Sequence, residues 1–464
     1  MKREKLLAAR VRKRLTLEDA AELLGVNANT LYKWEAGKAT PRFYNIQKLC
    51  EVYEASPWEL GLDVLPAPVT SQALATNEAL SRLMQTDLTL RLLVIIFEPH
   101  RVSCQHLQRL QHRIREIIEE ERTMDKDILS RREALQRLAL LPFATLQLNA
   151  LGASLSRPIE DILTQCAAGV AACWHLSKSA EGSDLALAFQ CVSGYLPTLK
   201  AIVKDSSQYR KPAANLTGQC ALLQTILGLH LQGFKEAEQY AQEAVAYSKE
   251  AQDIPLLLSA LDYAAWMHYF AKHSQQALHT IEQALPLLKQ KPYGTSLPPL
   301  LCADVYSTLA VMQAKNGQDG IASLGLAKEA LFAPPFDEPF FVGIEYTTSD
   351  VFLEEGLFHY HQGESDRALS AFSQLVDPNT LASKLPMPER VRIGALNDMA
   401  RALLNHETKD MERVIHLWKA ALEGAMRLHS EQRLNEVLVT YEIMESLWPR
   451  EKRILELRDL IIRW

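Results

Sequence analysis

The sequence predicts an all-α protein, in which a small N-terminal helical unit is followed by a long array of paired helices. Three observations predict this fold class. Apolar residues recur at helical spacing from about residue 75 to the C-terminus. Glycine and proline, 19 and 21 of the 464 residues, cluster between these periodic segments. A pattern of small and large apolar residues also repeats along the chain, as it does in arrays of helix pairs.

Charge is divided unequally along the chain. Residues 1–48 carry eleven Lys and Arg against five Asp and Glu, a balance of +6. Residues 49–464 carry 39 against 51, a balance of −12. A basic N-terminal unit on an acidic remainder indicates that only the N-terminal unit meets a polyanion.

Composition excludes several classes of protein. The chain is 48% apolar and 23% charged, which is enough to bury a core. The longest uninterrupted apolar run, residues 92–97, is far shorter than the ~20 residues that span a bilayer, and it suits a buried helix as well as a strand. Residues 1–5 are charged, unlike a secretory signal, and the seven cysteines form no C-x-x-C. We therefore expect a cytoplasmic protein with reduced thiols and no membrane contact.

The N-terminal unit carries the signals of two helices joined by a tight turn. Thr16 is a good N-cap for the first helix. Gly25 permits the positive φ that a tight turn between helices demands. Asn27 can cap a second helix, on which Leu31 and Trp34 face the core at i, i+3 spacing.

This segment resembles the Xre/phage-repressor type of helix-turn-helix domain. The resemblance spans residues 3–62 and includes the stretch G-V-N-A-N-T-L-Y-K-W-E-A-G-K-A-T-P-R. It implies a five-helix domain over residues 1–63 whose third helix enters the major groove of DNA. Family members hold a buried ion pair at the positions of Arg10 and Glu35, so the resemblance implies this structural pair here.

The same resemblance implies a surface that contacts a double-stranded DNA operator. That surface comprises Asn27, Ala28, Asn29, Tyr32 and Lys33 on the recognition helix and Lys38, Thr40 and Arg42 in the following loop. Asparagine can pair with adenine, lysine with guanine and alanine with the thymine methyl, whereas loop cations hold phosphates. Leu17 stands where many family members place a polar phosphate-contacting residue, and Ala28 where a polar base-reading residue is common. The sequence therefore leaves the base preference open, and a domain that binds protein instead of DNA is the alternative.

A linker and a helical connector follow the N-terminal unit. Residues 64–73 are the predicted linker, because two prolines bar a helix there and small side chains bury little. In the connector, residues 74–150, ten positions from Leu107 to Leu138 follow 3,4 spacing and eight of them are apolar. Such a seam is typical of a coiled-coil dimer. The alternative is one or two helices packed within one chain, since residues 130–133 fit a capping box that would begin a new helix.

Residues 151–464 resemble tetratricopeptide-like repeats. One unit reads Leu261, Ala264, Ala265, His268, Ala277, Ile281 and Ala284, and another reads Phe352, Gly356, His359, Gly363, Ala368, Phe372 and Leu375. Looser copies include residues 306–326 and 396–421, an earlier copy ends at 237–244, and a degenerate one covers about 159–200. Because one helix pair cannot bury its apolar face alone, neighbouring pairs must stack into an α-solenoid with a concave groove.

The repeat register places aromatic, amide and charged side chains on this groove. They are Asp262, Tyr263, Trp266, Tyr269 and Phe270 from one repeat, Asp350 and Tyr360 from another, and Asn397, Arg401 and Asn405 from the last. Amides can hold the backbone of a peptide and rings its side chains, so the set predicts a ligand groove. The alternative is that the aromatic residues belong to the core between repeats.

The sequence lacks the motifs of nucleotide, metal and hydrolase sites. It has no G-x-x-x-x-G-K-[ST], no H-E-x-x-H and no G-x-S-x-G, so we predict no catalytic residue, no metal and no cofactor. The layout of head and repeats resembles the bacterial RRNPP quorum-sensing regulators, whose repeat domains bind short peptides. This resemblance implies a sequence-specific transcriptional regulator whose repeat domain forms a homodimer and senses a short peptide or other ligand. The alternative is a tetratricopeptide scaffold that holds a protein partner, with DNA binding secondary or lost.

Overall fold

The fold is described from a computed structural model. It describes residues 4–13, 15–39, 41, 45, 48–49, 52–53, 55, 60, 88, 92, 95–96, 102–123, 128–150, 159–290, 297–333 and 347–462. The chain divides into two compact units, Met1–Asp87 and Leu88–Trp464. Every regular element in the described part is a helix, and the one extended pairing there is an isolated antiparallel bridge between Val376 and Ser383. The all-α prediction is confirmed, whereas the predicted linker lies outside the described residues.

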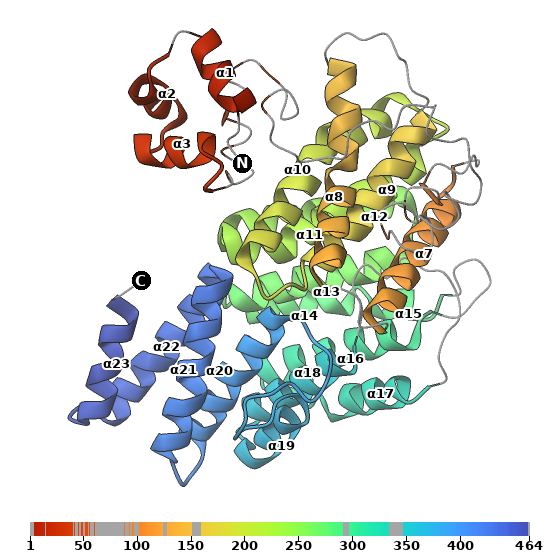
Figure 1. Ribbon diagram of the computed structural model, residues 1–464. Coiled ribbons are helices and arrows are strands. Elements are labelled where there is room, and N and C mark those ends of the chain that lie inside the picture. The colour runs from red at the N-terminus through yellow and green to blue at the C-terminus, as the bar shows by residue number, and fades with distance from the viewer. Residues whose placement is uncertain are drawn as a thin grey trace. The chain divides into compact units, whose positions relative to one another are not determined.

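Three described helices form the N-terminal unit (Figure 1): α1 (Glu4–Arg12), α2 (Leu17–Leu24) and α3 (Ala28–Glu35). Thr16 caps α2 in a reciprocal capping box with Asp19. Gly25 ends α2 at φ 68°, the left-handed conformation that the tight turn requires. Leu31 and Trp34 are buried, as their spacing predicts. Residues 45, 48–49 and 52–53 are helical too, and the rest of the predicted fourth and fifth helices lies outside the described residues.

The predicted heptad seam is divided between two helices, α7 (Cys104–Thr123) and α8 (Ile128–Ala150). Its apolar side chains are buried within the chain: Leu107 and Ile114 are fully covered, and Leu135 is 5% exposed. Both helices pack on α9 (Ile159–Leu176). The seam positions whose burial is described therefore agree with the alternative, helices packed within one chain, because the same 3,4 spacing serves packing inside one chain.

Helix pairs make up the rest of the described chain, which we call the repeat array. After α9 come α10 (Gly182–Asp205), α11 (Arg210–Leu231), α12 (Phe234–Ala251), α13 (Ile254–Phe270), α14 (Ser274–Glu282), the short α15 (Leu285–Leu288), α16 (Pro299–Lys315), α17 (Ile321–Leu331), α18 (Thr348–His361), α19 (Ser365–Leu375), α20 (Glu389–Asn405), α21 (Met411–Leu428), α22 (Glu431–Leu447) and α23 (Lys452–Ile462). The predicted repeat units at 261–284, 306–326, 352–375 and 396–421 each match one such pair. The prediction of stacked helix pairs is confirmed.

Small residues let the two helices of a pair approach closely. In the α18–α19 pair, a Cβ atom added to Gly356 would lie 2.3 Å from the ring of Phe372, which is fully buried. A glycine is therefore needed at this crossing, where the large ring fills the seam. The predicted small positions Ala264, Ala277 and Ala368 are likewise buried.

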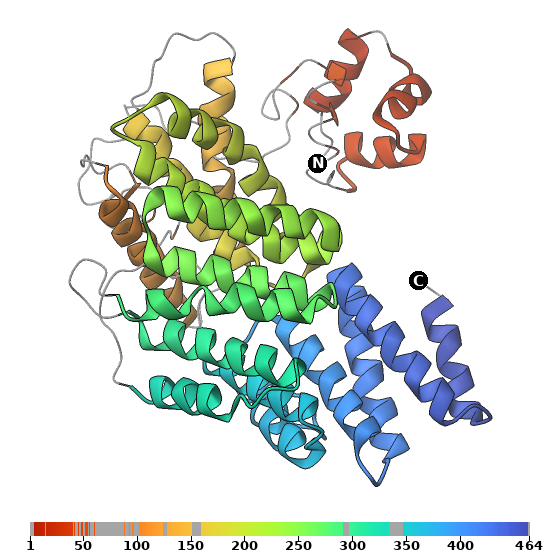
Figure 2. The same cartoon turned by 180° about the vertical axis from the view of Figure 1, so that it is seen from behind.

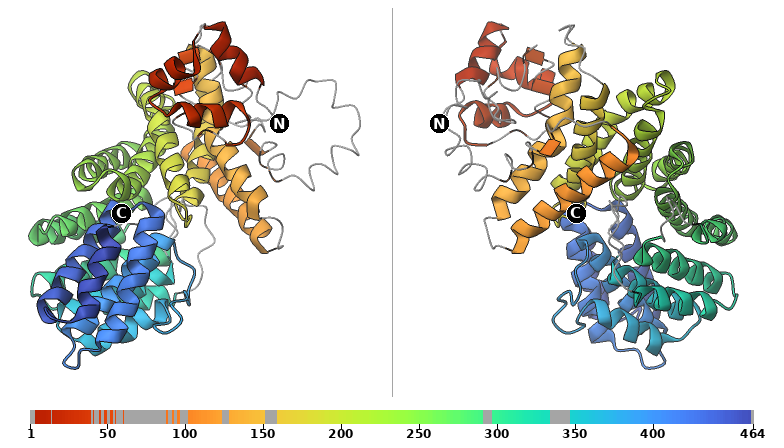
Figure 3. Two further views of the ribbon diagram at one scale, coloured as in Figure 1. Left: turned by 60° about the vertical axis from the view of Figure 1, so that its left-hand side comes forward. Right: turned by 90° about the vertical axis from the view of Figure 1, so that its right-hand side faces the viewer.

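The repeat array closes on itself. One helix of each pair faces inward, and α11, α13, α16, α18, α20 and α22 pack in sequence, after which α22 packs against α11 again. Figures 1 and 2 show the blue C-terminal helices lying against the green helices of the array, and Figure 3 gives two further views. We call these six helices the inner ring. The helices that the repeat register assigned to a concave groove therefore form a closed ring.

Buried contacts join the two ends of the inner ring. His230 Nδ1 on α11 lies 2.8 Å from Ser430 Oγ, at the N-cap of α22. At the first residue of α10, a Cβ added to Gly182 would lie 2.6 Å from the carbonyl oxygen of Leu428, so only a glycine allows this approach. Arg390 Nη1 on α20 donates to the carbonyl oxygen of Ser177, 2.6 Å away.

Among the described helices, α10 is long and apolar enough to cross a membrane by length and composition alone. Half of its most apolar stretch is buried within the protein, and it packs on α11 and α9. Asp184 in its first turn is 1% exposed and accepts hydrogen bonds from Arg132 and Gln136 of α8. These contacts are those of a core helix in an α-helical array.

Candidate functional site

The third helix presents the predicted DNA-contacting residues on its outer face. Asn29 and Lys33 are exposed, Tyr32 is 50% exposed, and Ala28 is half-buried. Asn27 is exposed, but its side-chain oxygen already accepts a hydrogen bond from the backbone N–H of Asn29 at 2.8 Å. Asn27 therefore caps α3 and orients the first turn of this helix. The capping bond uses the Asn27 side-chain oxygen and leaves the side-chain N–H₂ group available.

A cation in the following loop extends this face. The Lys38 ammonium lies 5.7 Å from the centroid of the Tyr32 ring, within the range of a cation–π contact. The backbone N–H of Lys38 also donates to the carbonyl oxygen of Lys33, which holds the loop against the end of α3. Thr40 and Arg42, the two other predicted loop contacts, lie outside the described residues.

An ion pair fixes α3 to the first helix. Arg10 Nε donates to Glu35 Oε1 at 2.7 Å, and Arg10 Nη2 donates to Glu35 Oε2 at 3.0 Å. Arg10 Nη1 donates to the carbonyl oxygen of Leu15, which ties down the turn before α2. The hydrogen bond to Glu35 raises the pKa of Arg10 above its usual value. Because the pair is bidentate and its side chains are only 14% and 7% exposed, it sets the direction of α3.

The inner ring holds the second predicted site. On α13, the ring of Trp266 lies 5.0 Å from that of Tyr269 and 5.8 Å from that of Phe270. These half-buried rings pack against the cores on both sides of the helix, and Trp266 Nε1 donates to Thr308 Oγ1 of α16 at 3.1 Å. Their contacts agree with the alternative interpretation of these aromatic residues as part of the packing between repeats.

Predicted groove residues from three helices do meet at one end of the ring. Tyr269 of α13 hydrogen-bonds His361 of α18 at 2.8 Å. Arg401 Nη2 of α20 donates to the hydroxyl of Tyr360 at 3.2 Å, and its guanidinium lies 4.9 Å from the centre of that ring. Burial, with Lys315 and Arg401 nearby, lowers the pKa of His361 to about 3, so its imidazole is neutral. Asn405 is exposed at the last turn of α20 and takes no part in these contacts.

A carboxyl cluster occupies another part of the ring. It consists of Asp262 on α13, Asp304 on α16, and Asp350 and Glu354 on α18, of which Asp262, Asp304 and Glu354 are 2%, 5% and 5% exposed. Thr308 Oγ1 donates to Glu354 Oε1 at 3.0 Å, and the Ser307 hydroxyl donates to the other Glu354 oxygen. Burial raises the pKa of Asp262 to about 7 and that of Asp304 and Glu354 well above their usual values.

Two predicted groove residues are buried and incompletely hydrogen-bonded. The Asp262 carboxyl hydrogen-bonds Thr308 and Asp304, but its Oδ1 atom has no partner, and neither has Asn397 Oδ1. The two side chains are 2% and 1% exposed. Asp350 is partly engaged, because it forms the capping box of α18 with Thr347. Burial lowers the pKa of Arg390, and the neighbouring Tyr263 and Asp350 oppose that shift. The inner ring therefore holds unsatisfied acceptors beside carboxyl and guanidinium groups.

Comparison with known families bears on the N-terminal unit. A family model described as Helix-turn-helix matches residues 6–60, the segment that contains α1, α2, α3 and the Arg10–Glu35 pair. Residues 6–60 form a helix-turn-helix domain. The resemblance drawn from the sequence is thereby confirmed for this part of the chain. No curated protein sequence matches the chain.

Two solved structures are similar to the chain at low identity. A crystal structure of Bacillus thuringiensis PlcR in complex with the peptide PapR7 and DNA is 11% identical, covers 71% of this chain and 95% of its own, and has a TM-score of 0.30. A crystal structure of the APC/C hetero-tetramer Cut9-Hcn1 is 12% identical, covers 83% of this chain and 96% of its own, and has a TM-score of 0.20. Superposition at these TM-scores is too loose to support an argument about fold or function.

Beyond the helix-turn-helix domain, sequence reasoning missed three residues of the inner ring. Asp304, Glu354 and Arg390 complete the charged network around the predicted groove residues. A signal for two of them was present, since Asp304 is the only acidic residue in an otherwise apolar helix and Glu354 lies one turn after Asp350. In the described part of the chain, no three His, Cys, Asp or Glu side chains are arranged to hold a metal ion.

The carboxyl cluster makes the stability of the repeat array depend on pH. Folding raises the pKa values of these acids. Their contribution to the free energy of unfolding is therefore complete below about pH 4, and it is lost as the pH rises through about 7. We predict that Asp304→Asn raises the Tm at pH 8 by a few degrees, the shift expected for ~1 kcal/mol, and by clearly less at pH 5. Thermal unfolding followed by circular dichroism measures this.

The matched control is Glu423→Gln, an exposed acid on α21 with no charged partner in the described contacts. It should leave the Tm unchanged at both pH values. An Asp304→Asn variant that is destabilised equally at pH 5 and pH 8 would show that this carboxyl is ionised and needed in the folded protein.

Proposed function

We propose that the protein is a DNA-binding transcriptional regulator that acts as a homodimer and senses a short peptide through its inner ring. The observation that carries this proposal is the outer face of α3, where exposed Asn29 and Lys33 stand on a helix whose direction is fixed by the Arg10–Glu35 pair. A helix held in this way can enter the major groove with its amide and ammonium groups towards the base edges.

Charge supports the same function. The balance of +6 over residues 1–48 favours the phosphate backbone, and the acidic remainder of the chain does not compete for it. Lys38 lies at the edge of the recognition face, where a cation meets phosphate rather than base. The domain should therefore read sequence through α3 and gain most of its affinity from phosphate contacts.

We predict different effects for the two lysines on binding to a duplex selected from a random pool. Lys33→Ala should lose about 1–3 kcal/mol on the selected duplex and relax the base preference, because it removes a base contact. Lys38→Ala should weaken binding to all duplexes equally, and it should reduce the slope of log K against log salt by about 1. Fluorescence anisotropy on the full chain measures both effects.

Lys235→Ala, an exposed lysine on α12 of the repeat array, is the control and should change nothing. A full chain that binds no duplex at low salt would contradict the proposal and favour the scaffold alternative.

Support for the sensing function comes from the unsatisfied atoms of the inner ring. A buried acceptor without a partner costs free energy, about 1–3 kcal/mol for a polar group of this kind. Asp262 Oδ1 and Asn397 Oδ1 are such acceptors, and the N–H groups of a peptide backbone are donors that fit them. Arg390 and Arg401 lie on the same ring and can receive carbonyl or carboxylate groups of the same ligand.

We predict that Asn397→Leu separates sensing from folding. The substitution removes the unsatisfied oxygen at similar volume, so the ligand-free protein should keep its Tm or gain slightly. Peptides that copurify with the wild-type chain should change its affinity for the operator by about 1–3 kcal/mol of coupling. The Asn397→Leu variant should lose this change. Anisotropy with and without the copurified peptide fraction, identified by mass spectrometry, measures this.

Asn405→Leu is the matched control, because Asn405 is an exposed asparagine at the end of the same helix. This substitution should leave the response to the peptide intact. An Asn397→Leu protein that responds like the wild type would place the effector elsewhere. Retention of a protein instead of a peptide would favour the scaffold function.

A further inference from the structure

A pocket of about 490 Å³ opens between α17, α18 and α19, and none of the predicted groove residues lines it. The positions that line it on α18 and on α19 are spaced three and four residues apart, so each helix gives one face to the pocket. Sites for small molecules commonly have volumes of roughly 300–1,000 Å³. The pocket is therefore large enough for a small organic ligand.

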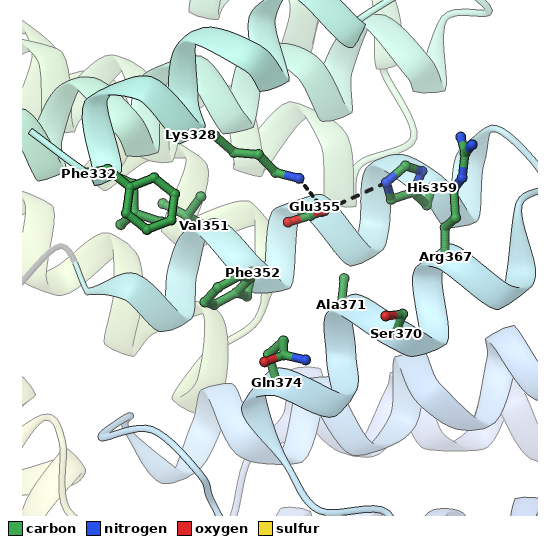
Figure 4. A pocket seen from close by; sticks show the side chains of 11 residues that line it. Lys328, Phe332, Val351, Phe352, Glu355, His359, Arg367, Ser370, Ala371 and Gln374 are labelled. Carbon is green, nitrogen blue, oxygen red and sulfur yellow. Dashed lines mark hydrogen bonds and ion pairs between the residues drawn. The ribbon is translucent and has the colours of Figure 1, made fainter.

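One end of the pocket is apolar. Phe332, Val351 and Phe352 form this end, and Figure 4 shows them together, with His359 and Arg367 at the other end. Phe332 forms one wall and is 81% exposed. A flat apolar body placed against this ring would remove it from water, and aromatic rings pack favourably on one another.

The acids at the charged end already have cationic partners. Glu355 Oε1 accepts a hydrogen bond from Lys328 Nζ at 2.6 Å and lies 3.8 Å from His359 Nε2. Glu364 Oε2 lies 2.7 Å from His359 Nδ1, and Arg367 Nη1 donates to both Glu364 oxygens at 2.9 and 3.1 Å. The hydrogen bonds from His359 and Arg367 lower the pKa of Glu364, so this carboxylate is ionised.

Donors at the charged end exceed these acceptors. Lys328 has three N–H groups and uses one on Glu355, and Arg367 uses only Nη1 in the described contacts, which leaves its Nε and Nη2 edge open. The two cations are 44% and 66% exposed, whereas Glu355 is 14% exposed. Ser370 and Gln374 also line the pocket from exposed positions on α19 and can donate. The charged end therefore suits a ligand group that accepts hydrogen bonds.

The charges of the lining have the same sense. Lys328 and Arg367 line the pocket against one acid, Glu355. Two further acids are exposed beside these cations in sequence, Glu329 and Asp366, but neither lines the pocket. Successive residues of a helix point about 100° apart, which directs these two side chains elsewhere. An anion is thus favoured over a cation at the charged end.

We propose that this pocket binds a small aromatic carboxylate. The ring of the ligand lies against Phe332 and Phe352, and its carboxylate receives hydrogen bonds from Lys328 and from the open edge of Arg367. A guanidinium edge of this kind can hold both oxygens of a carboxylate. The site goes beyond the proposed function, because it shares no residue with the recognition helix or with the predicted peptide groove.

Three probes of one shape test the charge of the ligand. Naphthoate, naphthamide and naphthylmethylamine carry the same ring with an anionic, a neutral and a cationic group. We expect the full chain to bind naphthoate roughly tenfold more tightly than naphthamide, and naphthylmethylamine most weakly, because only the carboxylate accepts charge-assisted hydrogen bonds. Titrations followed by ligand-observed NMR give the three Kd values.

Two substitutions at exposed lining residues locate the site. Arg367→Gln should weaken naphthoate roughly tenfold and leave naphthamide unchanged, because it removes the contact with the charged group alone. Phe332→Ser should weaken both probes equally, by roughly two- to tenfold, because it removes a wall that both rings contact. Circular dichroism verifies that both variants are folded.

Matched controls lie elsewhere on the repeat array. Arg427→Gln replaces a half-exposed arginine of α21 that pairs with Glu389 as Arg367 pairs with Glu364, and Val439→Ser replaces a half-exposed apolar residue of α22. Both should leave every Kd unchanged.

The results can overturn the proposal in two ways. Equal affinity for naphthoate and naphthamide, or tightest binding of naphthylmethylamine, contradicts an anion site. Naphthoate binding that is the same in the wild type, Arg367→Gln and Phe332→Ser contradicts this pocket as its location. Neither result bears on DNA binding by α3, so the proposed function is tested separately.

Discussion

The contact between α11 and α22 is the constraint on which the rest of the repeat array depends. His230 and Ser430 meet there, 200 residues apart in sequence and both almost fully buried. Burial lowers the pKa of His230 well below its usual value, so a neutral imidazole makes the contact. Because this contact closes the array, the inward faces of six helices become an interior rather than an open groove. Polar residues that an open solenoid would hydrate must then find partners within the ring.

The chemistry of the inner ring follows from that closure. Carboxyl groups on three neighbouring helices share a space from which water is largely excluded, so they retain protons near neutral pH. Asp262 and Asn397 keep oxygens without partners, which costs stability that apolar side chains would not cost. Sites of recognition commonly hold such unsatisfied groups, because a ligand that satisfies them gains affinity from atoms already desolvated.

Local features of the fold were predictable from the sequence, and long-range ones were not. Gly25, the Thr16 cap and the small positions of the helix pairs act within one turn or one pair, so spacing predicted them. The 3,4 seam predicted burial but not its partner, since packing inside one chain and between chains uses the same period. Ring closure depends on the summed rotation of successive pairs, which no local pattern encodes. For that reason the sequence register found Trp266 and Asn397 on the inward faces but not the buried network around them.

Hydrogen exchange of the full chain with and without His230→Ala tests the closed ring most directly. If α22 packs on α11, loss of the imidazole should raise amide exchange both in residues 210–231 and in residues 430–447, with residues 299–331 unchanged. The exposed His279→Ala on α14 should raise exchange in neither segment. An increase confined to α11, with α22 exchanging as in the wild type, would contradict the closed ring and restore an open solenoid.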